Sequence, residues 1–305
     1  FCCAFSENVI KQVSMTDKKP HKKVSSLPEE NKTPPAASET RPTKGKGEES
    51  DSFLNAILWA AVIALVVRTF LFEPFSIPSE SMYPTLKVGD YLFVKKYEYG
   101  YGKYSFPFGL AEFDGRILED TPERGDIVVF RKPYAEHIDY IKRVIGLPGD
   151  TVKMTDGQLF INGERVPRDF IGMDTVNERG FLQTYHRYVE SLPDGPQHYM
   201  YEINDEGPLD FTPRFTVPEG YFFAMGDNRD ESQDSRVIAD VGFIPVENLV
   251  GKAAFFFFSF EPIGDECLKS GSWATLRRIG CIAAAIPGHI RYERLLRPVH
   301  RGVEP

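Results

Sequence analysis

Two serines in one short segment are the first residues whose chemistry stands out. The segment, residues 77–86, reads IPSESMYPTL and places Ser79 and Ser81 between two prolines. Proline restricts its own backbone and that of the residue before it, so we expect these hydroxyls in an extended, exposed loop. Taken alone, the segment is also typical of an ordinary Ser/Pro turn after a helix.

A lysine in a predicted strand is the next such residue. Residues 139–150 read DYIKRVIGLPGD, and alternation along a strand puts Tyr140, Lys142 and Val144 on one face and Arg143 on the other. Taken alone, a lysine between Tyr and Val is commonly a surface residue whose stem lies along apolar neighbours.

Two further segments accompany these. RGDIVVF, residues 124–130, predicts a strand opened by a turn. GDNRDESQDSR, residues 226–236, is dense in turn-forming and charged residues, and taken alone it is also typical of an ordinary solvated loop. Carboxylates alternate in it as in a calcium loop, but the full EF-hand ligand pattern is missing, so we do not expect calcium binding there.

A serine and a lysine can together perform nucleophilic catalysis. A serine hydroxyl is a poor nucleophile until a base takes its proton. Lysine is such a base only when neutral, so its pKa must fall well below the ordinary value of about 10.4, which burial among apolar groups achieves. Tyr140, Val144 and Met82 are candidates for that apolar setting. His137 lacks an accompanying triad pattern, so we prefer Lys142 as the base.

The four segments, in this order after an apolar stretch, resemble the conserved boxes of type I bacterial signal peptidases (leader peptidases). The residues that carry the resemblance are IPSxSMxPTL, RGDIVVF, DYIKRVIGLPGD and GDNRDxSxDSR. It covers residues 72–258, loosely over 151–220. The resemblance implies that Ser81 is the nucleophile and Lys142 the general base of a serine endopeptidase.

Supporting roles are implied as well. Ser79 would stabilise the oxyanion beside the backbone N–H of the nucleophile, a type of contact that lowers a barrier by about 3 kcal/mol. Ser232 would position the lysine amine. Asp227, Asp234 and Arg236 are expected to form a structural ion-pair network rather than to act as catalysts. No cofactor and no metal is implied.

In this family, shallow apolar pockets accept small residues one and three positions before the bond that is cut. The lining expected here is Phe75, Ile77, Pro78, Met82, Leu86, Tyr140 and Ile141. Two residues depart from the family pattern: Glu80 stands where Gly is frequent, and Glu231 where Asn is frequent. The first departure puts the substrate preference in doubt.

An apolar stretch precedes the first box. Residues 53–67 carry no charge, and counting on past Arg68 to Phe72 gives 20 residues. About 20 apolar residues let a helix cross the hydrocarbon core of a bilayer. We expect a transmembrane helix over 52–73, kept as an anchor rather than cleaved as a signal sequence, because no small-x-small site follows it.

The regions on either side of this helix differ in composition. Residues 1–51 are polar, rich in Lys, Glu, Pro and Ser, and lack apolar periodicity, which predicts a disordered tail. The cluster from Lys18 to Lys23 favours the cytoplasm for that tail by the positive-inside tendency. Residues 74–305 are then an extracytoplasmic catalytic domain, and the basic C-terminal tail is expected near the membrane surface.

The body predicts an all-β fold. Short apolar runs end at Gly, Pro, Asp or Asn, and Asp156-Gly157 and Asn162-Gly163 are hairpin-turn signals. No strand–helix alternation and no repeat is present. The resemblance implies coiled antiparallel sheets. Residues 171–210 are polar and irregular, and we expect a variable insertion there, as a subdomain or as long loops.

Charge and cysteine content exclude other classes. The net charge of −8 argues against a general nucleic-acid binder. None of the four cysteines has CxxC spacing, so a zinc site is not expected. Cys267 and Cys281 are either a short-loop disulfide or two free thiols.

The prediction is therefore a single-pass protein of the bacterial inner membrane with a periplasmic catalytic domain. Its expected partners are secretory preproteins and the lipid bilayer, without nucleic acid, and we expect a monomer. Two other classes stay open. A self-cleaving Ser–Lys repressor would need an upstream DNA-binding helix-turn-helix. A catalytically silent β-domain that binds envelope partners would not be acylated by a penem-type inhibitor at Ser81.

Overall fold

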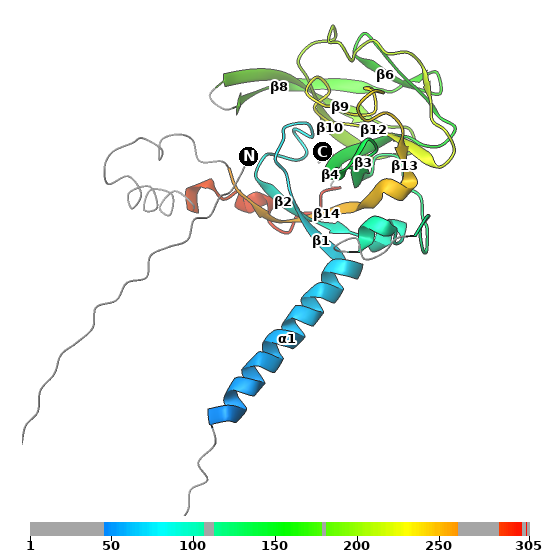
Figure 1. The fold of residues 1–305 in the computed structure, drawn as a ribbon. Helices are drawn as coiled ribbons and strands as arrows, with labels where there is room; N and C mark the ends of the chain where they lie inside the picture. Colours follow the sequence, from blue (N-terminus) through cyan, green and yellow to red (C-terminus); the bar gives the residue numbers. More distant parts are fainter. Residues whose placement is uncertain (1–45, 107–112, 179–180, 262–286, 301–302, 304–305) are drawn as a thin grey trace, which may run out of the picture. The chain divides into compact units, whose positions relative to one another are not determined.

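A computed structural model describes residues 46–106, 113–178, 181–261, 287–300 and 303 (Figure 1). Residues 52–305 form one compact unit, and residues 1–51 are assigned to another, of which only 46–51 are described. Most of the predicted disordered tail and the cysteines Cys267 and Cys281 lie outside the described residues.

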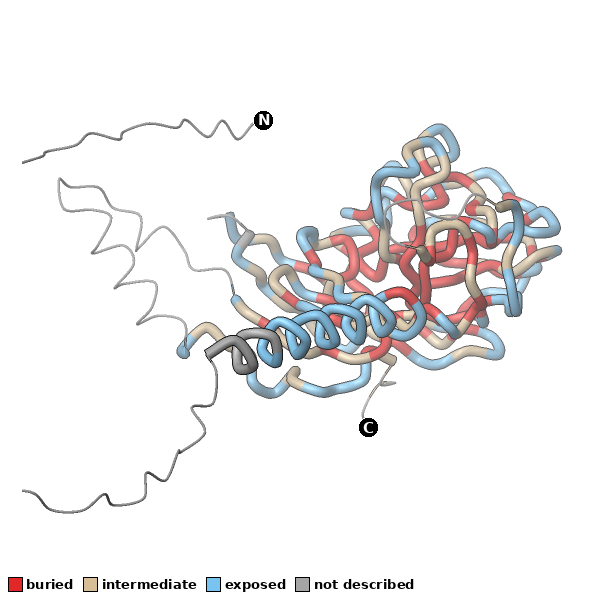
Figure 2. Tube along the Cα trace, turned by 60° about the horizontal axis from the view of Figure 1, so that its bottom comes forward, coloured by how far each residue is buried: buried red, intermediate tan, exposed pale blue. Residues whose placement is uncertain are grey.

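Helix α1 spans Lys46–Phe70, so it begins before the predicted boundary at 52 and ends before 73. Its end follows from Pro74, which holds the residue before it in an extended conformation, and strand β1 (Phe72–Ser76) begins at once. Within α1, Ser52–Phe70 is long and apolar enough to cross a membrane, and nearly all its side chains are exposed (Figure 2).

The remainder of the described chain is mostly β-sheet, which confirms the expected fold class. The largest sheet is antiparallel, with strand order β1-β2-β14-β3-β4-β12-β13. Besides β1, its strands are β2 (Asp90–Lys95), β14 (Leu249–Ser259), β3 (Ile127–Lys132), β4 (Ala135–Gly146), β12 (Tyr221–Met225) and β13 (Ile244–Pro245). Short 3₁₀ helices in the described ranges are η1 (Tyr97–Tyr99), η2 (Lys103–Ser105), η4 (Val246–Asn248) and η6 (Tyr292–Arg294).

A four-stranded sheet has the order β11-β5-β6-β7. Its strands are β11 (Phe215–Thr216), β5 (Thr151–Thr155), β6 (Gln158–Ile161) and β7 (Glu164–Arg165). The two predicted hairpin turns are confirmed, because Asp156-Gly157 and Asn162-Gly163 join consecutive strands and all four residues have positive φ. Such turns match the twist of the strands that they connect.

The region predicted as a subdomain or long loops contains a three-stranded antiparallel sheet. Its order is β10-β9-β8, with β8 (Arg168–Glu178), β9 (Phe181–Ser191) and β10 (Gln197–Glu202). The sequence hides these strands because much of β8 and β9 is solvent-exposed and carries polar residues, so neither shows a clean apolar alternation.

The order of strands in the largest sheet brings the four segments together. RGDIVVF supplies β3, which pairs with β4 so that Val128 lies opposite Lys142. On its other side β4 pairs with β12, whose last residue, Met225, lies opposite Arg143 (Figure 1). The chain leaves β12 directly into Gly226, so the fourth segment starts beside the lysine.

Candidate active site

The Ser79–Ser81 segment is the loop between the paired strands β1 and β2. Two backbone bonds close its base: Ile77 N–H donates to Asp90 O at 2.9 Å, and Gly89 N–H donates to Ile77 O at 3.0 Å. Met82 and Leu86 insert from the loop into the core. These hydrogen bonds and apolar contacts fix the backbone at Ser81. The residue is 8% exposed.

A buried carboxylate ties this loop to the C-terminal segment. Asp90 is fully buried and accepts bonds from Ser259 Oγ at 2.6 Å and Arg294 Nη2 at 2.6 Å, and Arg291 Nη2 lies 3.4 Å from it. Arg294 also donates to the carbonyl of Thr85 at 2.8 Å. Two arginines of the basic tail are therefore engaged with the loop inside the domain.

Lys142 lies against Ser81. Its Nζ is 2.6 Å from Ser81 Oγ and 3.1 Å from the carbonyl of Ile141, and it lies 5.3 Å from the centre of the Tyr140 ring. The lysine is 4% exposed, and in the described part of the chain no carboxylate lies within 4.0 Å of its amine.

Burial determines the proton affinity of this amine. It lowers the pKa of Lys142 from 10.5 to about 8, although Asp234 and Asp227 act in the opposite direction through their charge. At neutral pH about a tenth of such a lysine is unprotonated. A buried hydroxyl at hydrogen-bond distance from this amine can lose its proton to it.

The two other predicted serines lie differently. Ser79 is exposed, and its Oγ lies 3.5 Å from Ser81 Oγ, at the limit of hydrogen bonding. Ser232 is buried, and no hydrogen bond joins its hydroxyl to Lys142 in the described chain. Gly226 explains its close packing: a Cβ there would stand 2.3 Å from both Ser232 Oγ and the carbonyl of Ser81.

The predicted ion-pair network is two separate pairs. Arg236 binds Asp234 through Nε and Nη2, each at 2.9 Å, and Asp234 also accepts the N–H of Gly226 at 3.0 Å. Asp227 pairs instead with Arg143, a partner that sequence reasoning missed. Strand alternation had placed Arg143 on the face opposite to Lys142. It could not show that the buried carboxylate of Asp227 lies on that face.

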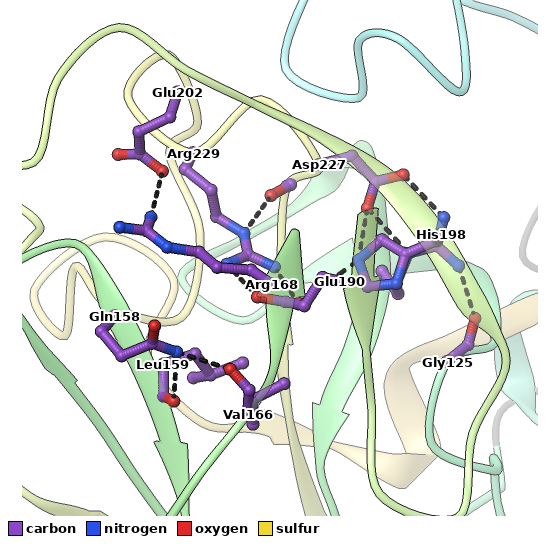
Figure 3. Close-up of polar contacts among 12 residues, drawn as sticks. Gly125, Gln158, Leu159, Val166, Arg168, Glu190, His198, Glu202, Asp227 and Arg229 are labelled. Carbon is purple, nitrogen blue, oxygen red and sulfur yellow. Dashed lines mark hydrogen bonds and ion pairs between the residues drawn. The ribbon is translucent and has the colours of Figure 1, made fainter. Parts of the chain in front are cut away.

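A second buried cluster of charged and titratable side chains lies next to Asp227 (Figure 3). Arg229 donates to Glu190 Oε1 at 2.9 Å and Oε2 at 2.5 Å, and His198 Nε2 lies 3.4 Å from Glu190 and 3.9 Å from Asp227. Burial lowers the pKa of His198 to about 4, so this ring is neutral at physiological pH. These contacts join the β8–β10 sheet to the fourth segment, and no local sequence signal predicts them.

The predicted pocket residues divide into two groups. Phe75, Tyr140 and Ile141 are half-buried, and Pro78 is exposed, so all four retain surface. The other three are core residues: Ile77, Met82 and Leu86 are 3%, 1% and 0% exposed. These three apolar side chains fasten the loop to the body and lie beneath its surface.

Among the described residues, one group has the spacing of a metal site. It consists of Glu202, Asp210 and Asp230 and includes neither Ser81 nor Lys142.

Comparison with known proteins gives concordant matches. A family model described as "Signal peptidase, peptidase S26" matches residues 50–258, more than half of the chain. The signal peptidase I of Rickettsia typhi is 42% identical over 230 residues, which cover 72% of this chain and 83% of that protein. That of Rickettsia massiliae is 41% identical over 213 residues, covering 67% of this chain and 78% of that protein.

Among solved structures, a signal peptidase I from Enterococcus faecalis is 27% identical, and the match covers 44% of this chain and 97% of that one. Its TM-score of 0.27 is too low to support an argument from shape.

Proposed function

The chain belongs to the S26 family of signal peptidases, and on that basis we propose that it removes signal peptides with Ser81 as the nucleophile and Lys142 as the general base. The observation that carries the proposal is the 2.6 Å separation of Lys142 Nζ and Ser81 Oγ, at an amine whose burial lowers its pKa to about 8.

The reaction proceeds in two halves. Neutral Lys142 takes the proton of Ser81 Oγ as that oxygen attacks the carbonyl carbon of the scissile peptide, and the carbonyl oxygen becomes an oxyanion. The lysine ammonium then returns the proton to the leaving nitrogen, the C–N bond breaks, and an ester on Ser81 remains. Lys142 next takes a proton from water, the hydroxide adds to the ester, and the acid product leaves as Ser81 regains its proton.

Oxyanion stabilisation falls to Ser79 and to the backbone N–H of Ser81. The hydroxyl of Ser79 is exposed and close to Ser81 Oγ, so a small rotation directs it at the oxygen of a bound substrate. Gly226, Asp227, Asp234, Arg236 and Ser232 hold the fourth segment against the loop. Their role is to position the pair, because both acids, Asp227 and Asp234, are already bound by arginines.

We assign substrate contact to the four predicted pocket residues that retain surface: Phe75, Pro78, Tyr140 and Ile141. Their side chains are apolar or aromatic and partly exposed, which suits contact with small side chains of the small-x-small type. Glu80 precedes the nucleophile and adds a negative charge at this edge. Secretory preproteins are the substrates, and the protein acts as a monomer.

Anchoring follows from Ser52–Phe70, which we assign as a single span in the bacterial inner membrane, with residues 1–51 as the cytoplasmic tail and the β-domain on the periplasmic side. Strand β1 begins two residues after the helix and ends next to the catalytic loop. A short connection of this kind keeps the site near the bilayer, where substrates are held by their own apolar segments at high effective concentration.

Cleavage of a preprotein whose signal ends in Ala-x-Ala tests the assignment. The intact chain in detergent or vesicles should release mature protein, and Ser81→Ala and Lys142→Ala should each lower the rate by at least about 10³-fold with an unchanged thermal melt. Ser76→Ala and Lys153→Ala are the matched controls, one exposed serine and one lysine of β5, and should cleave normally. Normal processing by either dyad variant would refute the proposal.

A further inference from the structure

Three carboxylates from separate segments converge at one end of β10. Glu202 is the last residue of that strand, Asp210 lies in the loop before β11, and Asp230 belongs to the segment 226–236. One oxygen of each lies within 4.8 Å of the other two. Two ligands that are each about 2.4 Å from a common centre can be up to about 4.8 Å apart, so this spacing accommodates a calcium ion.

Three carboxylate oxygens of this cluster are buried and lack a hydrogen-bond partner among the described residues. Glu202 is 0% exposed, and neither of its carboxylate oxygens has a hydrogen-bond partner. Asp210 Oδ1 is also buried without a partner. A buried carboxylate that lacks hydrogen bonds is strongly disfavoured, so these oxygens require either a bound cation or a proton.

Neighbouring arginines do not supply enough positive charge. Arg168 Nη1 lies 3.9 Å from Glu202, beyond hydrogen-bond distance (Figure 3). The same guanidinium donates at 2.8 Å to Asp205 and to the carbonyl of Gly157. Arg229 is bound to Glu190 by both of its terminal nitrogens. The cluster therefore keeps an excess of negative charge.

Backbone N–H groups bind one carboxylate oxygen of each of the two aspartates. Within the described ranges, the other oxygen of each accepts no backbone hydrogen bond. Asp230 Oδ2 accepts the N–H groups of Ile203 and Asn204 at 2.7 and 3.2 Å, and Asp210 Oδ2 accepts that of Gly207 at 2.7 Å. A Cβ at Gly207 would stand 2.5 Å from Asp230 Oδ1, so a side chain there would have to displace this carboxylate. The three carboxylates are held in place from outside the cluster.

A shared proton is the competing explanation. Burial raises the pKa of Glu202 to about 9, ahead of the negative charges of Asp210 and Asp230. One proton, however, makes a single hydrogen bond between two of the three unsatisfied oxygens and leaves the third without a partner. A cation contacts all of them at once.

Against the expectation from the sequence that the segment 226–236 binds no calcium, we propose that Glu202, Asp210 and Asp230 together bind a calcium ion, which joins the loop 203–210 to that segment. The ligand set consists only of carboxylates, without His or Cys, and it lies on irregular backbone, which suits calcium better than zinc or the strictly octahedral magnesium. Water and backbone carbonyls complete the coordination. The site adds stability and is independent of the Ser81–Lys142 chemistry.

Thermal unfolding of the full chain in detergent tests this site without any activity readout. After EGTA treatment, calcium chloride at about 10 mM, roughly ten to a hundred times the Kd of extracellular calcium modules, should raise the melting temperature by about 3 °C or more. Magnesium at the same concentration should give less than half of that shift. Calorimetric titration should count one calcium ion per chain.

Variants assign the binding to these residues. Asp210→Asn and Asp230→Asn should lose the calcium shift, and in EGTA they should melt no lower than the unsubstituted chain because a buried repulsion is relieved. Glu206→Gln, an exposed acid of the same loop, should keep the full shift.

Three results overturn the proposal: no calcium shift in the unsubstituted chain, a shift retained by both aspartate variants, or an equal effect of magnesium. A melting temperature that does not respond to calcium but falls as pH rises from about 5 to 8, between the ordinary pKa of a glutamate and the raised pKa of Glu202, would assign the cluster to the shared proton instead.

Discussion

Arg143 binds Asp227 with two parallel hydrogen bonds, Nε to Oδ1 at 2.7 Å and Nη2 to Oδ2 at 2.6 Å. The same carboxylate accepts the hydroxyl of Thr85 at 2.5 Å, from the loop that carries Ser81. Consecutive residues of β4 thus reach the loop by different routes: Lys142 bonds to the serine directly, and Arg143 acts through the acid. Strand β4 therefore carries Lys142 itself and, through Asp227 and Thr85, also fixes the loop that carries Ser81.

Substitution of Arg143 should strongly destabilise the folded protein. The pair is almost wholly buried, so Arg143→Leu leaves Asp227 as a buried charge and should lower the free energy of unfolding by about 3–5 kcal/mol. Urea denaturation measures this. The partly exposed pair of Arg131 and Asp139 is the control. Arg131→Leu should lower the free energy of unfolding by no more than about 1 kcal/mol. Similar losses in the two variants would contradict the buried role.

The close approach at Gly226 gives a second prediction. In Gly226→Ala the new methyl meets Ser232 Oγ and the carbonyl of Ser81 at 2.3 Å, so the loop must move. We expect about 1–3 kcal/mol of destabilisation and at least about 10²-fold slower cleavage. Gly288→Ala, where no atom lies within 4 Å of the added carbon, should behave as the unsubstituted protein. Full activity in Gly226→Ala would show that the loop tolerates displacement.

The rate of cleavage should rise with pH. Since burial lowers the pKa of Lys142 to about 8, kcat/KM should increase about tenfold per pH unit below that value and level off above it. A pH–rate profile on a short peptide substrate measures this. A profile that is flat between pH 6 and 9 would remove the lysine as the base.

The same group links pH to stability. The folded-state pKa of Lys142, about 8, lies below the ordinary 10.5, so the unfolded chain binds more protons between these values. Its contribution to the free energy of unfolding must therefore rise with pH across that window. Lys142→Met should flatten this rise relative to the unsubstituted chain when urea denaturation is repeated from pH 7.5 to 10. An unchanged slope would show that other groups produce it.

Tyr185 should influence catalysis from the β8–β10 sheet. Its hydroxyl bonds to Glu231, which also accepts from Asn228 Nδ2 at 3.1 Å, and Asn228 donates to the carbonyl of Glu80 at 3.3 Å. Tyr185→Phe breaks the first link and should lower kcat by about 2–10-fold with little change in KM. Tyr199→Phe on β10 is the control and should leave both constants unchanged. An effect on KM alone would place the tyrosine in substrate binding.

Local patterns were sufficient for the residue types and the elements near them in sequence. Uncharged residues over 53–67 specify an apolar helix, and Asp-Gly and Asn-Gly specify tight turns, because these preferences act within a few residues. The four boxes likewise predict Ser81 and Lys142 as the residues with reactive chemistry, from residue types and their neighbours in sequence alone.

Tertiary structure alone decided which side chains meet. The 2.6 Å contact of Ser81 with Lys142, the pairing of Arg143 with Asp227, and the burial of Leu86 all depend on strands that lie far apart in sequence. Hydrogen bonding, desolvation and packing act over a few ångströms in space, and a linear pattern does not contain those distances. For the same reason the β8–β10 sheet and the convergence of Glu202, Asp210 and Asp230 became visible only in the folded chain.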